Sequence, residues 1–553
     1  MSRSRLAIVV GVLQLWGVGI TALAQPAMDP ASAASRVDKI FEAFAGPESP
    51  GCAVSVAKRG EVVVSRGYGM ANLEYSVPIT PQTIFEAGSV SKQFTAAAIG
   101  LLAQDGRLSL DDEVRKYVPE LPDFGTPIRI GHLLNHTSGL RSQWPLLMLA
   151  GRSPGEAVHT VDEILDLVKR QRRLNFSPGD EYLYNNTGYT LLGVIVQRVS
   201  GRSLAAFTAE RLFAPLGMTR TSWRDDHTRV VKNRATAYAR GKDGSMHTAM
   251  SFTNVYGNGG LLTTVGDLQK WNANLDDPTV GGPALVEWLQ TRGRLNDGFE
   301  IAYARGLQLL DYRGIREVSH GGATAGYRAY LARFPDDRVS VAVLCNVSTA
   351  DPSRLVHGVA EEVLDRQPRP VEPAVKVPAG HLAPKVGLYR NPSTDAVLRV
   401  AMNQEHLTIG GANGDPLLPL GAGQFRVGDT STRVVFEPDG SVMPLRVTLE
   451  GTGSRPSMFE RVAQAEPGVT QLAEYAGAFR SDELDTTYSI AVKEGALWLR
   501  HRWLEPVRLR AAYADAFEAG EGRVLRFTRD STGAVDGLTV YAGRVRHLRF
   551  DRQ

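Results

Sequence analysis

The C-terminal part of this 553-residue chain repeats itself, and the repeat sets the domain plan of the protein. The segment HLAPKVGLYR, which begins at His381, aligns with QLAEYAGAFR, which begins at Gln471. The register holds to the ends of both copies, where residues 459–461 (FER) align with residues 550–552 (FDR). Short alternating segments separated by Asp-Gly, Gly-Gly or Thr-Gly turns are typical of antiparallel sheets and small barrels. We therefore predict two small antiparallel β-barrel domains, residues 384–464 and 470–553.

A proline-rich stretch, residues 366–383 (RQPRPVEPAVKVPAGHLA), precedes the repeat. Its many prolines prevent a continuous helix and favour an extended spacer. A chain of this length is also longer than one hydrophobic core supports. We therefore predict a linker here and a separate N-terminal domain over residues 31–365.

The N-terminal domain mixes short strand patterns with longer helical periods, which predicts an α/β or α+β fold. A hairpin is expected over Ala53–Lys58 and Glu61–Tyr68, and a second strand pair over Arg328–Phe334 and Val339–Asn346. Helices are expected over Ser91–Gln104, Val161–Gln171 and Thr190–Val199. Because strands come from both ends of the segment, we expect them to share a sheet, with the helices between them in sequence.

The charges exclude several kinds of partner. There are 62 basic and 59 acidic residues, which are interspersed and give a net charge of +3. No basic stripe or acidic tail points to nucleic acid or to an anionic surface, so a small molecule or a short peptide is the expected partner. The oligomeric state cannot be read from the sequence.

The first 24 residues resemble an export signal. Arg3 and Arg5 precede an apolar run that ends in Ala22-Leu23-Ala24, the small-x-small pattern of a signal-peptidase site. We expect a signal peptide cleaved after Ala24 and a secreted or periplasmic protein. The alternative is an uncleaved anchor, because the run approaches the length that spans a bilayer. No later stretch is apolar enough to span, so the mature protein should have no membrane span.

The two cysteines, Cys52 and Cys345, each lie in or beside a strand-like run. In an oxidising compartment they could pair, but two buried free thiols fit the sequence equally well.

The first chemical signal is the segment FEAGSVSKQFTAAA, residues 85–98, which runs from a glycine into an alanine-rich helix. Ser89 and Lys92 are three residues apart, so their side chains share one face of the first turn. Backbone N–H groups at this helix end would favour the negative charge of an attacked carbonyl. To act as a base, Lys92 must lose about 3 pKa units, or about 4 kcal/mol, which burial and a nearby cation can impose. The alternative is a serine that caps a helix.

The second signal is Tyr184 and Asn186, two residues apart in the segment DEYLYNNTGYT. We expect them in a loop before a helix, where both side chains can point into one cavity. The Tyr184 hydroxyl could then relay the Ser89 proton to a leaving group. The alternative is a tyrosine half-buried in a turn.

The third signal is the glycine-rich segment VSHGGATAGY, residues 318–327, just before the last strands. Gly322 would let a substrate lie against the strand edge and pair with its backbone. His320 would place a donor or a cation beside the substrate. The N–H of Ala323 could complete an oxyanion hole with that of Ser89.

Three motifs occur in this order: S-x-x-K at Ser89 and Lys92, Y-x-N at Tyr184 and Asn186, and H-x-G at His320 and Gly322. Together they resemble the serine β-lactamase and penicillin-binding protein superfamily, especially its class C β-lactamase, D-aminopeptidase and esterase branch. The resemblance covers residues 31–364 and includes IGHLLNHTSGL (130–140) and GNGGL (257–261). It implies a helix-flanked sheet, a helical subdomain and a site between them.

The resemblance also assigns roles. It makes Ser89 the nucleophile, gives proton transfer to Lys92 and Tyr184, and gives substrate contacts to Asn186 and His320. Many β-lactamases of this superfamily have lysine where His320 stands, which argues against tight recognition of a β-lactam carboxylate.

The architecture is similar to that of D-aminopeptidases, in which two lipocalin-like barrels follow such a domain and a barrel can reach into the site and limit substrate size. We expect an acyl-enzyme hydrolase that cleaves amide bonds of small peptides or amino-acid amides, D-configured ones included. Esters or β-lactams are alternative substrates of the same nucleophile. A different alternative is a non-catalytic protein that binds cell-wall peptide or β-lactam.

Other chemistries find less support in the sequence. His132 and His136 are four residues apart but lack the glutamate of H-E-x-x-H, so structural roles are expected. No G-x-S-x-G elbow, P-loop or dinucleotide-binding motif occurs. No cofactor and no metal are predicted.

Overall fold

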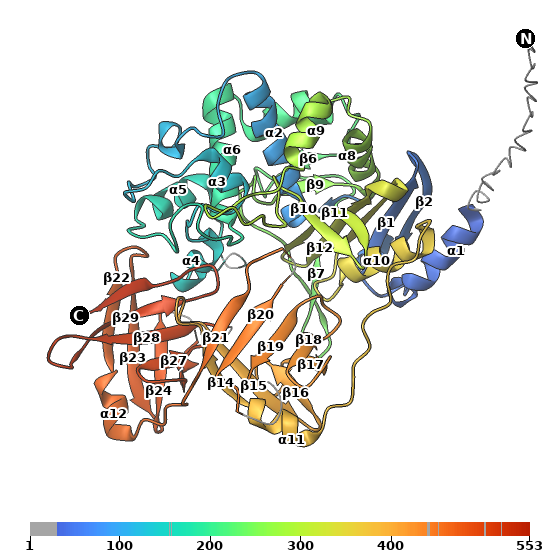
Figure 1. Ribbon diagram of the computed structural model, residues 1–553. Coiled ribbons are helices and arrows are strands. Elements are labelled where there is room, and N and C mark those ends of the chain that lie inside the picture. Colours follow the sequence, from blue (N-terminus) through green and yellow to red (C-terminus); the bar gives the residue numbers. More distant parts are fainter. Residues whose placement is uncertain are drawn as a thin grey trace, which may run out of the picture.

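The structure is a computed structural model that describes residues 30–553, except residues 154, 156, 439–442, 452, 503–504 and 521. The predicted signal peptide, residues 1–24, lies outside the described residues. The predicted fold class is confirmed: a mixed α/β domain is followed by two antiparallel β-domains that lie side by side beneath it (Figure 1).

A six-stranded antiparallel sheet forms the centre of the N-terminal domain, in the order β10-β11-β12-β13-β1-β2. Its strands are β1 (Cys52–Lys58), β2 (Glu61–Tyr68), β10 (Gln308–Tyr312), β11 (Ile315–Thr324), β12 (Tyr327–Phe334) and β13 (Val339–Cys345). The predicted hairpin and the predicted second strand pair are both present. They join where β1 pairs with β13, so the two ends of the domain meet in the middle of the sheet.

Helices cover both faces of this sheet. Helices α1 (Pro30–Ile40) and α10 (Pro352–Val363) pack on one face, and α8 (Val265–Asp276) packs on the other (Figure 1). Strand β13 is therefore buried along its whole length, as expected for a strand with both faces covered. At the edge of the sheet, most of β2 is exposed or half-buried.

The remaining helices form a subdomain beside the sheet. They are α2 (Lys92–Gln104), α3 (Ile130–Leu134), α4 (Gln143–Leu149), α5 (Val161–Lys169), α6 (Asn186–Ser200), α7 (Leu204–Thr208) and α9 (Gly282–Leu289). Helix α5 begins at the predicted residue, Val161, directly after Thr160, whose side chain caps the helix. The helix buries Ile164, Leu167 and Val168. Helix α6 packs against α2.

One expectation about α6 is wrong. This helix starts at Asn186 and not at Thr190, so Asn186 belongs to the helix and not to the loop before it. The reason is an N-cap: the side chain of Asn185 accepts a hydrogen bond from the N–H of Gly188 at 2.8 Å.

Three small sheets connect these parts. They are β3 (Met70–Asn72) with β4 (Val77–Pro78); β5 (Phe85–Glu86), β9 (Leu261–Thr263) and β6 (Ser222–Trp223); and β7 (Tyr238–Arg240) with β8 (Met246–Thr248).

The linker differs partly from the prediction. Residues 367–378 contain no helix or strand, as the prolines require. The short helix α11 (Ala379–Leu382) then forms inside the predicted linker, because Pro378 is followed by five residues without proline. Its Leu382 is buried in the core of the first barrel.

The first β-domain, called barrel 1 below, is closed. Its strands are β14 (Gly387–Arg390), β15 (Val397–Asn403), β16 (His406–Ile409), β17 (Asp415–Pro419), β18 (Gln424–Val427), β19 (Arg433–Glu437), β20 (Arg446–Glu450) and β21 (Ser457–Val462). Pairing of β14 with β21 closes the barrel around Tyr389, Phe425 and Phe436.

The second β-domain, called barrel 2, follows helix α12 (Val469–Glu474) and is nearly closed. Its strands are β22 (Gly477–Ser481), β23 (Thr486–Lys493), β24 (Ala496–His501), β25 (Val507–Arg508), β26 (Arg510–Ala511), β27 (Ala516–Glu518), β28 (Val524–Arg529), β29 (Val535–Tyr541) and β30 (Leu548–Arg552). The two edge strands, β25 and β26, are neighbours in sequence, so the nine-stranded sheet curls back almost onto itself.

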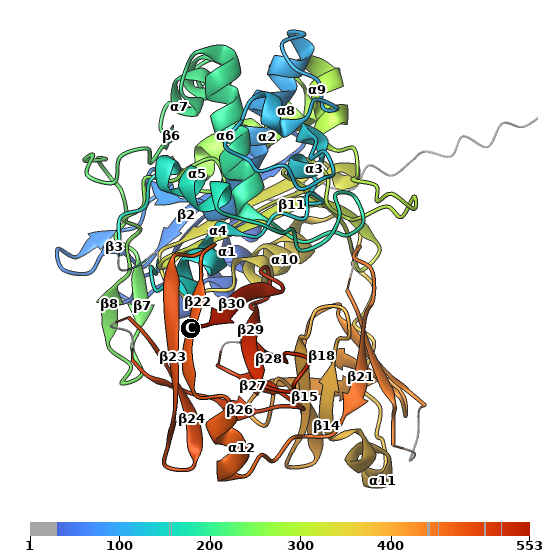
Figure 2. The ribbon, with the colours of Figure 1, turned by 90° about the vertical axis from the view of Figure 1, so that its left-hand side faces the viewer.

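Barrel 2 contacts the helical subdomain through buried polar groups. Arg141 and Glu483 form a buried ion pair at 2.7 Å. The hydroxyl of Tyr488, on β23, donates to the carbonyl of Leu149 at the end of α4, at 2.9 Å. Figure 2 shows the ends of β22 and β23 directly below α4. A buried pair is costly to break, so this contact holds the barrel in one orientation.

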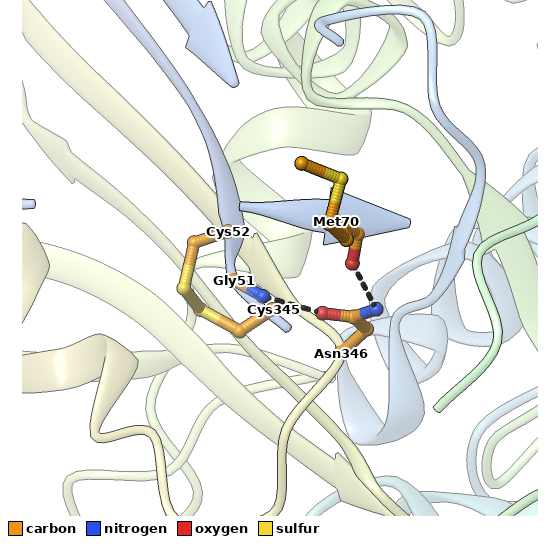
Figure 3. The surroundings of a disulfide bond; sticks show 5 residues. All are labelled: Gly51, Cys52, Met70, Cys345 and Asn346. Carbon is orange, nitrogen blue, oxygen red and sulfur yellow. Dashed lines mark hydrogen bonds between the residues drawn. A yellow bond between two sulfur atoms is a disulfide. The ribbon is translucent and has the colours of Figure 1, made fainter. Parts of the chain in front are cut away.

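A disulfide joins the two ends of the N-terminal domain. Cys52 on β1 and Cys345 on β13 are cross-strand partners and are bonded, which decides between the two states that the sequence left open (Figure 3). Beside the bond, Asn346 accepts from the N–H of Gly51 at 2.8 Å and donates to the carbonyl of Met70 at 3.0 Å.

Removing the disulfide should lower stability. The bond closes a loop of 293 residues, so it restricts the unfolded chain strongly. We expect the double variant Cys52→Ala/Cys345→Ala to lose about 2–4 kcal/mol of unfolding free energy in this domain. Calorimetry with and without reductant checks this. Reductant should lower the melting temperature of the wild type but not of the variant, and equal responses would contradict the expectation.

Candidate active site

Ser89 lies in a tight 3₁₀ turn, η2 (Gly88–Ser91), between β5 and α2. Its side chain caps neither η2 nor α2, so the alternative of a helix-capping serine is wrong. Glycines let this turn lie directly on β11. A Cβ at Gly88, where φ is +52°, would lie 2.7 Å from the nitrogen of Ala323, and a Cβ at Gly322 would lie 2.0 Å from the carbonyl oxygen of Ala87. Any larger residue would force the turn away from the strand.

Lys92 is the first residue of α2 and is fully buried. Its Nζ lies 3.1 Å from the Oγ of Ser89, and it donates to the Oδ1 of Asn186 at 2.9 Å and to the carbonyl of Asn258 at 2.6 Å. Burial lowers the pKa of Lys92 well below its ordinary value, and the positive charge of Arg544 lowers it further. A neutral amine has two N–H donors for the two carbonyl oxygens and a lone pair for the Ser89 proton. The geometry therefore suits a general base.

Tyr184 lies beside this amine. The Nζ of Lys92 is 4.8 Å from the centre of the Tyr184 ring. The hydroxyl is shielded from solvent and has no hydrogen-bond partner of good geometry in the described part of the chain. Burial raises the pKa of Tyr184 well above its ordinary value, while the Ser89 hydroxyl and Arg544 oppose that shift. Tyr184 thus keeps its proton at neutral pH and can donate it.

His136 fixes the segment that carries Tyr184. It is buried, with φ at +59°, and its Nδ1 accepts from the N–H of Asn185 at 3.1 Å. Its carbonyl accepts from the N–H of Leu183 at 3.0 Å. These contacts hold the backbone on both sides of Tyr184, in line with the structural role expected for His136.

His320 is neutral in this site. Burial lowers the pKa of His320 to about 3, and the positive charge of Lys92 makes a smaller contribution in the same direction. Its Nδ1 lies 2.6 Å from the carbonyl of Gly321, so Nδ1 carries the proton, and the hydroxyl of Tyr303 donates to Nε2 at 3.0 Å. Of the two roles expected for His320, that of a cation is wrong, because the buried ring does not hold a charge. Its one N–H is already donated to the backbone.

The strand edge beside Ser89 is open to a substrate. Pairing of β10 with β11 ends at Ser319, so His320 to Thr324 have a strand neighbour only on the β12 side. Thr324 and Tyr327 close a two-residue turn, which puts Ala323 in the next, non-hydrogen-bonded pair. Its N–H therefore points away from β12, toward η2 and Ser89. This is the arrangement expected of an oxyanion hole formed by Ser89 and Ala323.

A cavity of about 240 Å³ opens at this point, lined by Ser89, Asn186 and Ala323 among others. The structure thus brings the three predicted motifs together: η2 and α2 supply Ser89 and Lys92, the start of α6 supplies Asn186, and β11 supplies Gly322 and Ala323.

Sequence reasoning gave no role to three residues of the site, Asn258, Tyr303 and Arg544. Asn258 lies in the segment GNGGL, whose likeness was noted without a function. Tyr303 and Arg544 lie outside every motif. The guanidinium of Arg544 comes from barrel 2 and lies 4.7 Å from the centre of the Tyr184 ring. No local signal could have found these two residues, because only the tertiary structure brings them to the site.

The chain is similar to known proteins in sequence and in structure. The family described as Beta-lactamase matches residues 37–364. A D-aminopeptidase of Brucella melitensis is 26% identical over 530 residues, which cover 91% of this chain and 96% of the relative. A D-aminopeptidase of Gluconobacter oxydans is 33% identical over 301 residues, or 54% of this chain and 56% of the relative. The octameric penicillin-binding protein homologue from Pyrococcus abyssi superposes with a TM-score of 0.57 at 26% identity, covering 78% of this chain and 100% of that structure.

The pKa of Lys92 should govern how fast Ser89 reacts. Because Lys92 accepts a proton only when it is neutral, the rate of Ser89 labelling by a fluorophosphonate should rise with pH through a limb well below the ordinary lysine pKa. Lys92→Ala should react at least about 100-fold more slowly. Arg544→Gln should move the limb to higher pH, because it removes a charge that lowers the pKa of Lys92.

Labelling rates measured between pH 5 and 11 would check this. An unshifted limb in Arg544→Gln, or a near-normal rate in Lys92→Ala, would mean that another group activates Ser89.

Proposed function

Because this chain belongs to the Beta-lactamase family, we propose that it is a serine hydrolase that forms an acyl-enzyme on Ser89 and cleaves amide bonds of small peptides or amino-acid amides, D-configured ones included. The observation that carries the proposal is the buried Lys92 amine, 3.1 Å from the Ser89 oxygen. The full-length similarity to a D-aminopeptidase supports amides as the substrate class.

The reaction follows from the positions of the groups. Ser89 Oγ attacks the substrate carbonyl while Lys92 Nζ takes its proton, and the N–H groups of Ser89 and Ala323 stabilise the oxyanion. The carbon–nitrogen bond then breaks, and the leaving nitrogen takes the hydroxyl proton of Tyr184, which Lys92 restores. Water attacks the acyl-enzyme by the same steps in reverse order and releases Ser89.

The protonation states favour amides. An amine is a poor leaving group unless its nitrogen is protonated, and the raised pKa of Tyr184 provides a neutral hydroxyl that can do this. A neutral His320 gives no positive charge at the position where a β-lactam carboxylate would be held by a lysine.

We also propose that the protein is exported. The charged start, the apolar run and Ala22-Leu23-Ala24 support a cleaved signal peptide. The Cys52–Cys345 bond supports an oxidising compartment. Among the residues described, no helix has the length and apolar character needed to cross a membrane.

A substrate panel tests the enzymatic proposal. Wild-type protein and Ser89→Ala would be assayed on D- and L-amino-acid p-nitroanilides, p-nitrophenyl esters and nitrocefin. We expect turnover of D-anilides and a loss of at least about 1,000-fold in Ser89→Ala, because the nucleophile is removed without loss of core packing. Activity confined to esters or nitrocefin would assign esterase or β-lactamase activity. Labelling of Ser89 without turnover would indicate a binding protein.

Export has its own test. Expression of the full chain in a bacterial host with intact secretion should yield a protein that begins at Gln25, as read by intact mass after fractionation. A chain that keeps residues 1–24 and sediments with the membrane would support the anchor instead.

A further inference from the structure

Barrel 2 places a positive charge at the active site. The hairpin loop between β29 and β30 turns through Gly543, with φ at +57°, and the backbone groups of Ala542 and Val545 bond across the turn. Arg544 lies in this turn, and its guanidinium rests on the ring of Tyr184 at 4.7 Å. The distance from the same ring to the Lys92 amine is 4.8 Å. One tyrosine ring thus contacts both the proposed base, Lys92, and a residue of a different domain.

The backbone of this loop is held from both sides. Asn175 donates to the carbonyl of Arg544 at 3.1 Å and accepts from the N–H of Arg546 at 2.8 Å. The N–H of Ser142 donates to the same Arg544 carbonyl at 3.3 Å. Arg141 donates to the carbonyls of Arg546 and His547 at 3.2 Å each. The position of Arg544 is therefore set before any substrate binds, which reduces the ordering cost of a contact to it.

The guanidinium of Arg544 has no acidic partner among the residues that the structure describes, and none of them accepts a hydrogen bond from it. The neighbouring Arg546 differs, because it pairs with Glu181 at 2.9 Å. Arg141, at the same interface, pairs with Glu483. A half-buried guanidinium with free donors is an unusual feature beside a catalytic serine, since partly desolvated charges are normally paired.

The position of Tyr184 shows which part of a substrate would meet Arg544. In the proposed reaction, Tyr184 gives its proton to the leaving nitrogen, so the leaving group lies against the Tyr184 hydroxyl. Arg544 lies on the ring of that same residue. A leaving group that lies against this hydroxyl would therefore lie near the guanidinium of Arg544, which is 4.7 Å from the centre of the Tyr184 ring.

We propose that Arg544 of barrel 2 is a specificity-determining residue that binds the terminal carboxylate of the leaving group. The enzyme therefore prefers short peptides with a free C-terminus to amides and anilides of the same amino acid. A guanidinium matches a carboxylate with two parallel hydrogen bonds, which is the geometry that a peptide terminus offers. The inference rests on the proposed amide hydrolysis at Ser89, and it goes beyond size exclusion because it assigns a charge preference.

The test compares two leaving groups that differ only in this carboxylate. With X as the amino acid of the best anilide substrate, kcat/KM would be measured for X-Gly and X-Gly-NH2 by release of X. Glycinamide is the less basic amine and the better leaving group, so intrinsic reactivity opposes the expected preference. We expect X-Gly to be favoured about tenfold or more, as for a charge-assisted hydrogen bond, and the preference to shrink at high salt.

Variants of the loop give matched controls. Arg544→Gln should bring the ratio of the two kcat/KM values close to 1, and Arg544→Lys should leave an intermediate ratio. Arg546→Gln removes a charge from the same loop but should keep the wild-type ratio, because Arg546 is paired with Glu181 and lies on the ring of Phe176. If Arg544→Gln is inactive, the Arg544→Lys ratio and the salt dependence of the wild type decide.

The outcomes separate the two proposals. Ser89-dependent hydrolysis of anilides with equal rates on X-Gly and X-Gly-NH2, or a preference that survives in Arg544→Gln, would overturn the role of Arg544 alone. Absence of hydrolysis of every amide, or hydrolysis that persists in Ser89→Ala, would overturn the proposed function and this inference with it.

Discussion

The arrangement of this site depends on one physical fact: the Lys92 amine is completely buried and forms no ion pair with any carboxylate of the described residues. A protonated amine in such a place is strongly disfavoured, so the surroundings hold Lys92 in the form that can accept a proton. Two carbonyl oxygens fix its direction, one from Asn186 and one from Asn258. The third direction leads to Ser89. The same burial keeps Tyr184 protonated and His320 uncharged.

Burying that amine requires several elements to converge on it. The turn η2 must lie on β11, which is possible only because Gly88 and Gly322 have no Cβ. Helix α6 must begin at Asn186, which the cap at Asn185 ensures. In the sheet that carries β11, the disulfide links β1 and β13, the two strands that join the ends of the domain. Local backbone features at distant points of the sequence thus combine into one desolvated pocket.

Barrel 2 contributes a charge to the surroundings of Lys92 and is not only an appended domain. Its loop brings Arg544 to Tyr184, and its Glu483 pairs with Arg141 in the helical subdomain. The chain leaves the N-terminal domain through residues 367–378, which contain no helix or strand, and then turns into α11. It reaches barrel 2 only after it has formed barrel 1. The position of the Arg544 charge, which we propose binds the leaving group, therefore depends on how barrel 2 packs against the N-terminal domain.

The sequence by itself determined the fold class, the strands at both ends of the N-terminal domain, the two β-domains and the residues Ser89, Lys92, Tyr184, Asn186, His320, Gly322 and Ala323, which the structure brings together. The fold class, the strands and the two β-domains follow from hydrophobic periodicity and from the repeat. The site residues follow from three short motifs whose order resembles a known superfamily. It did not reveal where α6 begins, whether Cys52 and Cys345 are bonded, that His320 is uncharged, or that Tyr303 and Arg544 reach the site. Those were decided by the tertiary structure, because bonding, desolvation and charge all depend on which groups from distant parts of the chain are brought within a few ångströms of one another.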